Sequence, residues 1–521
     1  MGIEPISAAW KAAVIAFIRH VRECYGTPGH YNKMEKKFNI PHLPAHEAFA
    51  RLRESFPLHF LLESKQVSLF SGRFSLIGLD PVLKISGKKE EAKIELLQPR
   101  GLSYFNKLLE QDFSFVDKIK KTERTITVEV KKQEGSFEES SRPTMKNISQ
   151  VIRLLLTTFG MKEKTLLGLY GAMSYDFIRL FEDLHDRLPE NEVNDFTFFL
   201  YDTFIFFDHI KEKSEVIVYR ESEKESKEVV ELVTVLLKKP LPEKKEFQIS
   251  QHHLALDQQA FEDLVRIGKK NITEGEFVQV VFSNRLEAAY SGDPYTLYLN
   301  YREKNPSPYL FYFEFGDGEE LVGASPEMMV RCEEGRVHLR PIAGTARRGS
   351  DPIEDHDLMV ELLTNPKERA ELEMLIDLGR SDLARICEPK IQIDDYRFVE
   401  KYSRVMHTVA HLSGKLRKRF CGLDALISCL NAGTLTGAPK VAAMRCIEQY
   451  EQQRRGYYGG TFGQLTFSSE VDTTIIIRTA HLKNGTLTYQ SGAGIVYDSD
   501  PTKEYEETLN KMKAFTDTFS S

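Results

Sequence analysis

The hydrophobic pattern alternates between a period of two and a helical period along the 521 residues. Alternating, β-branched and aromatic stretches that end at Gly, Pro or Asp predict strands. They include FPLHFLLES, VSLFSGRFSLIGLDP, VLKISG, FTFFLYDTFIFFDH, SEVIVYR, FVQVVFSNRLE, YLFYFEF, EELVGASPEMMVRCEEGRVHLRPIAGT, TTIIIRTAHL and GTLTYQSGAGIVYDSD. Helices are predicted around 258–272, 366–387, 421–430, 438–455 and 501–517. Because these elements mix without a βαβ rhythm and several strands meet at Asp-Gly or Asn-Gly turns, the pattern predicts an α+β fold with a mainly antiparallel sheet.

Three segments differ from this pattern. Residues 117–147 are polar and poor in large apolar side chains, so we predict an exposed insertion with little order. The charged segment 238–250 is the best internal boundary, which gives an N-terminal region 1–245 and a C-terminal region 246–521. Residues 1–23 contain only a short apolar run, which predicts an amphipathic helix rather than a signal peptide.

Composition narrows the class of partner. The net charge is −7 with mixed signs throughout, which offers no basic stripe for nucleic acid and no basic cluster for anionic lipid. The six cysteines include no C-x-x-C pair, so neither a disulfide framework nor a zinc site is indicated, and a cytoplasmic location is expected. A transmembrane helix would need a run of about 18 apolar residues, and the sequence contains no such run. A small molecule or a protein is the expected partner.

Several common catalytic motifs are absent from the sequence. It contains no G-x-x-x-x-G-K-S/T loop, no G-x-G-x-x-G fingerprint and no G-x-S-x-G elbow. His407 and His411 are spaced as zinc ligands could be on a helix, but the glutamate of H-E-x-x-H and a third ligand are missing. We therefore expect no zinc site from this pair.

Two E-x-x-E pairs occur in segments predicted to be helical, Glu368 with Glu371 and Glu504 with Glu507. Residues three apart share a helix face, so each pair points two carboxylates the same way. One interpretation is a solvated acidic surface. The other is a divalent-cation site built from two distant helices. Oxygen ligands alone would favour Mg²⁺ with positions left open for an anionic substrate.

Two further segments are suited to binding an anion. In SGAGIV, the backbone N–H groups of Gly492, Ala493 and Gly494 allow close approach, although a bulge or tight turn in a strand is an alternative. Arg478 interrupts TTIIIRTA, a run otherwise fit for a buried strand. A guanidinium there is costly unless a bound carboxylate or a protein carboxylate pairs with it.

Tyr458 in RRGYYGG and Thr434 in NAGTLTGAPK stand beside glycines, where a hydroxyl can face a cleft or serve only for packing or capping. Together with the carboxylates and the anion-binding segments, they describe a site for a small dicarboxylate with Mg²⁺.

These residues resemble the chorismate-utilising enzymes, and within them the family of anthranilate synthase large components (component I). The matching stretches run in the family's order over nearly the whole chain: LLES (61–64), SGRFSLIGLDP (71–81), GEFVQVVFS (275–283), NPSPYLFYF (305–313), VGASPE (322–327), RPIAGTARRG (340–349), ERAELEMLIDLGRSDLARI (368–386), YSRVMH (402–407), GTLTGAPKV (433–441), RRGYYGGTFG (454–463), DTTIIIRTA (472–480) and SGAGIVYDSDPTKEYEETLNK (491–511). The resemblance implies two mainly antiparallel β-sheets packed together with helices on the outside.

The resemblance also implies roles for the candidate residues. Glu371 and Glu507 would bind Mg²⁺, with Glu368 and Glu504 as outer carboxylates, and the ion would hold the ring carboxylate of chorismate. Glu327 of ASPE would be the general acid for the departing 4-hydroxyl, a role that suits a carboxyl whose pKa is raised by burial near other carboxylates. The remaining residues would bind substrate or assist the reaction: Arg478, Tyr458, Gly492, Ala493 and Gly494 would hold the enolpyruvyl carboxylate, Gly344 and Thr345 would line the ring pocket, His407 would assist elimination of pyruvate, and Thr434 would position ligand or water.

Two positions distinguish the branches of the family. Isochorismate and salicylate synthases carry a lysine that activates water where this chain has Gln279, whose neutral amide cannot act as that base. Aminodeoxychorismate synthases carry a nucleophilic lysine where this chain has Ala343. Ammonia remains as the nucleophile. The expected activity is therefore the Mg²⁺-dependent lyase reaction of tryptophan biosynthesis that converts chorismate and ammonia to anthranilate and pyruvate.

Two partners follow from the same resemblance. None of the cysteines lies in a G-x-C-x-G-H-Q context, so a separate glutamine amidotransferase subunit (component II) would supply the ammonia. Ser64 of LLES, with Pro308, Tyr309 and Leu310 of NPSPYL, resembles the family's pocket for feedback inhibition by tryptophan. Leu310 replaces an expected methionine, which leaves the strength of inhibition open.

Two departures flank the predicted metal helix. Leu372 replaces the histidine of A-E-H-x-M-L, and R-N-D has become Arg380-Ser381-Asp382. They leave three alternatives open: an aminodeoxychorismate synthase component I, an aminodeoxyisochorismate synthase component I, or a non-catalytic ligand-binding relative.

Overall fold

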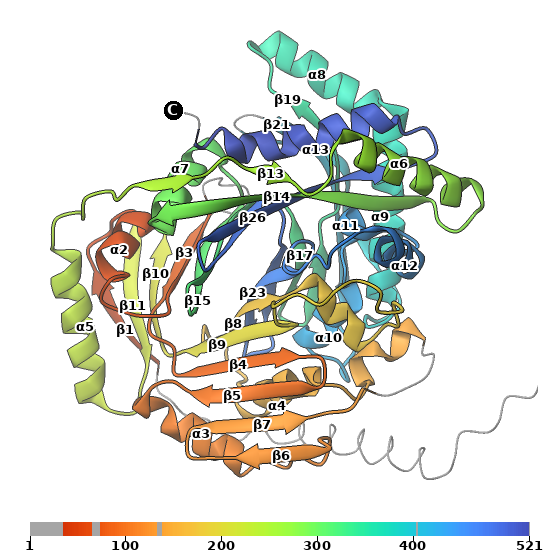
Figure 1. Ribbon diagram of the computed structural model, residues 1–521. Helices are drawn as coiled ribbons and strands as arrows, with labels where there is room; N and C mark the ends of the chain where they lie inside the picture. The colour runs from red at the N-terminus through yellow and green to blue at the C-terminus, as the bar shows by residue number, and fades with distance from the viewer. Residues whose placement is uncertain (1–34, 65–72, 133–137, 403–404, 520–521) are drawn as a thin grey trace, which may run out of the picture.

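The computed structural model describes residues 35–64, 73–132, 138–402 and 405–519 (Figure 1). The helix predicted over residues 1–23 lies outside this part. The described strands form two large antiparallel sheets, packed together and covered by helices. The predicted α+β fold with two packed sheets is confirmed.

The first sheet has this strand order: β1 (Glu35–Ile40), β11 (Lys213–Tyr219), β10 (Thr203–Asp208), β3 (Phe74–Gly78), β2 (Phe60–Glu63), β15 (Tyr309–Gly316), β16 (Glu319–Ser325), β25 (Thr479–Lys483), β26 (Thr486–Ile495), β14 (Gln279–Gly292) and β12 (Phe247–Ile249). Two short strands, β13 (His253–Leu254) and β22 (Gly437–Ala438), also pair with β14.

The second sheet has this strand order: β19 (Ile342–Arg347), β21 (Val405–Lys415), β18 (Arg336–Leu339), β17 (Met328–Glu333), β24 (Val471–Ile475), β23 (Thr461–Thr466), β8 (Gly168–Met173), β9 (Phe196–Tyr201), β4 (Leu83–Lys88), β5 (Glu91–Leu96), β7 (Thr125–Glu129) and β6 (Lys118–Lys121). In addition, β20 (Gln392–Lys401) pairs with β21. Both sheets combine strands from 1–245 and 246–521, so the predicted boundary separates segments of the chain and not separate sheets.

Aromatic side chains fill the space between the two sheets. Phe60 of β2 stacks on Tyr170 of β8 with ring centroids 4.9 Å apart, and Phe311 of β15 stacks on Phe462 of β23 at 4.4 Å. Such pairs contribute about 0.5–1.5 kcal/mol each beyond the area that they bury. The contacts hold strands from the beginning, the middle and the end of the chain in one core.

Helices cover the outer faces of the sheets, and their apolar residues form the outer cores. The first sheet carries α2 (Ala45–Leu52), α5 (Glu223–Leu237), α7 (Pro294–Lys304) and α13 (Pro501–Thr516), with α6 (Gln258–Thr273) and α12 (Lys440–Tyr450) at its β14–β26 end. The second carries α3 (Leu102–Leu109), α4 (Ser149–Thr158), α9 (Pro366–Ala384) and α10 (Gly422–Cys429). Shorter or peripheral elements are α8 (Pro352–Thr364), α11 (Gly433–Thr436) and 3₁₀ turns at Pro99–Gly101, Glu139–Thr144 and Tyr175–Leu180. No helix in the described ranges combines the length and apolar character needed to cross a bilayer.

The five predicted helices are present as α6, α9, α10, α12 and α13, with ends that differ by a few residues. The prediction of little order in 117–147 is wrong for its first half, where β6 and β7 form a hairpin at the edge of the second sheet. Ile126 and Val128 alternate with threonines in β7 and are buried. The charged residues on either side of β7 make the composition of the whole segment polar, so the period-two pattern of this short strand was missed.

Candidate functional site

Two neighbouring segments pass between the sheets at the same place, and each carries a candidate residue. Glu327 lies where β16 leads into β17, and Arg478 lies where β24 leads into β25. The hydroxyl of Ser325 donates to the carbonyl oxygen of Ile475 (2.7 Å). The carbonyl oxygen of Glu327 accepts from the amide of Ile475 (3.0 Å) and from the hydroxyl of Thr474 (2.7 Å). These bonds join the two segments in which the chain passes from one sheet to the other, the two crossovers.

Glu327 is buried, with 8% of its surface exposed. Burial raises the pKa of its carboxyl to about 8. The hydroxyl of Thr434, which lies 3.1 and 3.2 Å from the two carboxyl oxygens, lowers that pKa, and the charge of Glu371 raises it. Glu327 is therefore mainly protonated at neutral pH and can act as an acid.

Arg478 adopts φ 49°, a left-handed backbone conformation that is uncommon outside glycine and is found at functional sites. Its carbonyl oxygen accepts from the amide of Ala324 (3.0 Å) and the hydroxyl of Tyr301 (3.2 Å), which fix the turn. Arg478 thus lies between β24 and β25, and the expectation that it lies inside one strand is wrong. Within the described part of the chain its half-buried guanidinium has no hydrogen bond or ion pair, so it is available to an anion.

His407 of β21 faces two residues of β19. Its Nδ1 lies 3.0 Å from the Thr345 hydroxyl and 3.2 Å from the Gly344 carbonyl oxygen. Since a carbonyl only accepts, Nδ1 carries the hydrogen and Nε2 keeps its lone pair. Burial, followed by the charge of Arg478, lowers the pKa of His407 to about 4. The imidazole is therefore neutral at physiological pH.

Gly344 has to be glycine for two reasons. Its φ is 78°, and a Cβ at this position would lie 2.7 Å from a carboxyl oxygen of Glu368. The strand of the predicted ring pocket and the first acidic helix are therefore in direct contact.

Both acidic helices begin in the same way. Asn365 before α9 and Asp500 before α13 accept hydrogen bonds from backbone amides of the first turn, and a proline follows each of them. This start places the E-x-x-E pairs in the first two turns. The helix dipole favours negative charge in the first turn.

The carboxylates of the two helices interact electrostatically. Burial raises the pKa of Glu368, Glu371 and Glu504, and the charge of Glu507 raises each of them further. Glu507 is half-exposed and pairs with Lys511 (2.7 Å). In the described residues no three of these carboxylates bring oxygens within 4.8 Å of one another. Partly buried carboxylates that repel one another fit an oxygen-liganded cation such as Mg²⁺.

The glycine-rich strand β26 makes room for two polar side chains. A Cβ at Gly492 would lie 2.8 Å from the Tyr458 hydroxyl oxygen, and one at Gly494 would lie 2.4 Å from Nε2 of Gln279. Nζ of Lys511 donates to the carbonyl oxygen of Gly492 (2.8 Å). Lys511 thus links strand β26 to Glu507. It ends the matching stretch 491–511, but its role was not predicted from the sequence, and its spacing four residues after Glu507 is a signal that could have found it.

The amides of β26 cannot all serve one ligand. In an extended strand, successive N–H groups point to opposite edges. The amides of Gly492 and Gly494 therefore face one way and that of Ala493 faces the other. The prediction that all three hold one carboxylate is too broad.

Arg455 is a buried structural residue beneath the site; it lies in the matching stretch RRGYYGGTFG, but its role was not predicted from the sequence. It forms an ion pair with Glu451 (2.6 Å) and donates to the carbonyl oxygens of Leu435 (2.6 Å) and Val281 (2.7 Å). Its guanidinium carbon lies 5.7 Å from the centre of the Tyr458 ring. Arg455 thus connects Tyr458, the helix α11 that carries Thr434, and strand β14.

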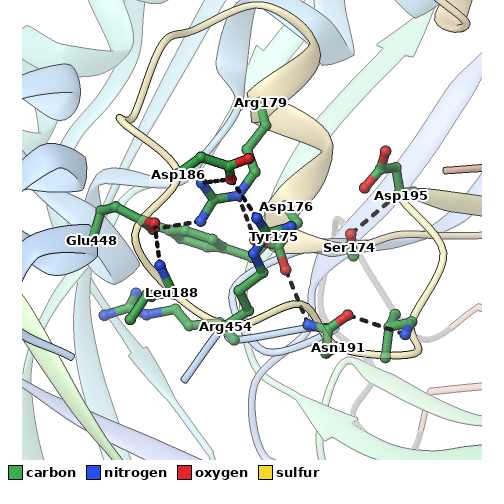
Figure 2. A network of polar contacts seen from close by, with 12 residues as sticks. Ser174, Tyr175, Asp176, Arg179, Asp186, Leu188, Asn191, Asp195, Glu448 and Arg454 are labelled. Atoms are coloured by element: carbon green, nitrogen blue, oxygen red, sulfur yellow. Dashed lines mark hydrogen bonds and ion pairs between the residues drawn. The ribbon is translucent and has the colours of Figure 1, made fainter. Parts of the chain in front are cut away.

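A second polar network fastens an N-terminal segment to the same region (Figure 2). Glu448 of α12 accepts from the amide of Leu188 (2.9 Å) and from Arg179 (2.5 Å). Arg454, next to Arg455, pairs with Asp186. Residues near 180 therefore hold the chain just before Tyr458 in place.

The predicted inhibitor residues lie apart from this site, and the structure brings them together. Ser64, Pro308, Tyr309 and Leu310 line one cavity of about 840 Å³ between the sheets. The Tyr309 hydroxyl donates to a carboxyl oxygen of Asp472 (3.1 Å) on the opposite sheet. The four residues thus form parts of one potential ligand cavity.

The two departures from the family motif do not remove any of these groups. Leu372 is fully buried among the apolar residues of the main core, and Ser381 is exposed. At position 372, where the motif would place a histidine, this chain has a leucine that packs in the core.

Comparisons with known proteins agree with the motifs. Residues 108–517 match the sequence profile of a family described as chorismate binding enzyme. Anthranilate synthase component 1 of Synechocystis sp. is 33% identical over 504 residues, which cover 89% of this chain and 91% of that protein. The protein of the same name from Aquifex aeolicus is 38% identical over 361 residues, or 67% of this chain and 73% of the other. The crystal structure of anthranilate synthase component I from Streptococcus pneumoniae TIGR4 is similar with a TM-score of 0.66 at 32% identity, covering 87% of this chain and 94% of that one.

Proposed function

This chain belongs to the chorismate-binding enzyme family, and from its similarity to anthranilate synthase component 1 proteins we propose that it is the chorismate-converting component of an anthranilate synthase. It would convert chorismate and ammonia to anthranilate and pyruvate. One observation carries the proposal: the joined crossovers hold a protonated Glu327 and an Arg478 without a protein partner in the described residues. An acid for a leaving hydroxyl and a fixed cation for a carboxylate are what this reaction needs.

The side chains divide the chemistry as follows. Glu327 donates its proton to the 4-hydroxyl, which leaves as water while ammonia bonds to C2. Arg478 and Tyr458 hold the enolpyruvyl carboxylate during this step. Neutral His407, with a lone pair on Nε2, then assists the elimination of pyruvate that makes the ring aromatic. Thr434 keeps the carboxyl of Glu327 oriented.

Mg²⁺ is part of this proposal, with Glu371 and Glu507 as its ligands and Glu368 and Glu504 around them. When bound, the ion would neutralise the ring carboxylate of the substrate. Ligation by Glu507 would replace its contact with Lys511.

Gln279 and Ala343 favour ammonia over other nucleophiles. Oε1 of the buried Gln279 has no hydrogen-bond partner among the described residues, and its amide group lies against Gly494. A neutral amide can accept a hydrogen bond from ammonia but cannot deprotonate water. Ala343 offers only a methyl group. The ammonia would come from a separate glutamine amidotransferase.

Tryptophan is the proposed ligand of the cavity that Ser64 lines. Thr474, whose hydroxyl bonds the Glu327 carbonyl, also lines this cavity. A ligand that displaces β24 would therefore displace the catalytic acid. The hydrogen bond between Thr474 and Glu327 would therefore transmit binding in the cavity directly to the active site, as feedback inhibition requires.

We expect the purified chain to make anthranilate from chorismate with ammonium salt but not with glutamine. Glutamine-dependent product should appear only after an amidotransferase partner is added, since no cysteine lies in the required motif. The assay follows anthranilate fluorescence and pyruvate release together. Glutamine-dependent product from this chain alone would refute the two-component proposal. Pyruvate without a fluorescent amine, or an amine without pyruvate, would point to another branch of the family.

Replacing Thr434 by Ala should move the alkaline limb of the pH profile to higher pH. The acid form of Glu327 is active, so kcat/KM for chorismate falls as pH rises through its pKa of about 8. The Thr434 hydroxyl lowers this pKa, and its removal should raise it. The profile is measured at constant free ammonia. Thr436→Ser, in the same short helix but bonded to Ala432, serves as the control. A limb that stays in place or moves to lower pH contradicts this role.

Glu507→Gln should lower turnover at least about tenfold, because loss of a metal ligand should cost no less than loss of the residues that support it. Activity is measured across a Mg²⁺ titration, and urea unfolding of the same sample tests the fold. The neighbouring exposed Glu506→Gln should behave as the unmodified chain does. Full activity of Glu507→Gln at limiting Mg²⁺ would remove Glu507 from the metal site.

Tryptophan should raise the thermal midpoint by binding only the folded state. Ser64→Phe should fill part of the cavity and abolish both this shift and the inhibition. Ser114→Phe at an exposed position is the matched control. Unchanged inhibition in Ser64→Phe would place the effector elsewhere.

A further inference from the structure

Two histidines from different strands face each other near one end of the second sheet. Nδ1 of His338 in β18 lies 3.1 Å from Nε2 of His411 in β21. A carboxyl oxygen of Asp394 in β20 lies 3.9 Å from the same nitrogen of His411. In the described ranges, this is the one group of three or more His, Cys, Asp or Glu residues whose ligand atoms all lie within 4.8 Å of one another.

These separations match a metal site. Two ligand atoms that each lie 2.0–2.1 Å from a tetrahedral Zn²⁺ are about 3.3 Å apart. The pair of nitrogens in His338 and His411 is slightly closer than this, and the oxygen of Asp394 is slightly farther away. Small side-chain rotations would therefore be enough for all three to bind one ion.

An irregularity in β20 brings a second carboxylate to His411. Asp395 is opposite His411, and the pairing of β20 with β21 shifts on both sides of Asp395. Neighbouring residues of a regular strand point to opposite faces, whereas an irregular register re-aims them. A carboxyl oxygen of Asp395 thus lies 4.0 Å from Nδ1 of His411, on the side of the ring away from His338. A carboxylate behind a ligating histidine is the usual support of a metal site.

The charges of Asp394 and Asp395 favour a cation beside His411, whereas those of Arg331 and Arg340 oppose it. Burial lowers the pKa of both imidazoles, and for His338 the charge of His411 lowers it further. Neutral imidazoles are the form that binds metal. The nearby arginines already have partners: Arg331 pairs with Asp472, Arg336 bonds Ser413 and Gln392, and Arg340 pairs with Glu400.

We propose that His338, His411 and Asp394 form a binding site for a transition-metal ion of the Zn²⁺ class. Imidazole nitrogens select such ions over Mg²⁺, so this site is chemically distinct from the four glutamates. Three protein ligands leave a position for water. The ion would tie β20 to β18 across β21 and so stabilise this end of the second sheet.

The site also explains why the histidine spacing misleads. His407 and His411 are on a strand, where four residues span about 13 Å, and cannot share an ion. His407 instead contacts Gly344 in the candidate active site. The metal partner of His411 comes from β18.

The test is a calorimetric titration of the full, tag-free chain with Zn²⁺ in saturating Mg²⁺, which keeps the glutamates occupied. One equivalent should bind and raise the thermal midpoint. Co²⁺ should give visible absorption bands of a nitrogen- and oxygen-liganded ion. His338→Gln and Asp394→Asn should each weaken Zn²⁺ binding at least about tenfold and remove the Co²⁺ bands. Asp395→Asn should weaken binding about tenfold by loosening His411.

His185→Gln is the matched control, because His185 also lies beside a carboxylate, Asp183, at 3.8 Å, but outside this group. It should leave Zn²⁺ binding unchanged. His338 is half-buried and Asp394 is exposed, so neither substitution should unfold the chain. The thermal midpoint without metal verifies that each variant folds. The proposal is overturned if the unmodified chain binds no Zn²⁺ in these conditions, or if His338→Gln binds it as tightly.

Discussion

The hydrogen bonds between the two sheet crossovers are the constraint on which the candidate site depends. A strand that leaves one sheet for another loses its ladder partners, and its backbone groups need new ones. Here Ser325, Thr474 and the backbone of Ile475 supply them. The same bonds fix Glu327, and the bonds that the carbonyl oxygen of Arg478 accepts from Ala324 and Tyr301 hold its left-handed turn. Acid and cation are thus positioned by the geometry that joins the two sheets.

A buried ion pair supports the side of the candidate site that carries Tyr458. Arg455 lies beneath Tyr458, forms an ion pair with Glu451 and donates to backbone carbonyls of two other elements. Removing either partner would leave an uncompensated buried charge, which typically costs about 3–5 kcal/mol. Segments from the first half of the chain reinforce this side through Glu448. The N-terminal region therefore contributes to the rigidity of the site as well as to the cavity that Ser64 lines.

Local patterns predicted what depends on local order. Helical spacing located α9 and α13, and the E-x-x-E spacing placed Glu371 and Glu507 on them, while motif resemblance led to the two-sheet fold. Contacts between residues far apart in the sequence could not be predicted from such local patterns. The turn at Arg478 follows from a change of sheet, and the meeting of His338 with His411 follows from strand order and an irregular register. Neither leaves a periodic signal in the sequence.

The mixing of early and late strands in both sheets has a consequence for biosynthesis. Strand β2 pairs with β15, and β8 pairs with β23, which is made only near the end of translation. While the ribosome is still extending the chain, these early strands have open edges, and such edges are where nascent chains associate wrongly. Closure of both sheets has to wait for the last strands, so folding of this chain is largely a post-translational event.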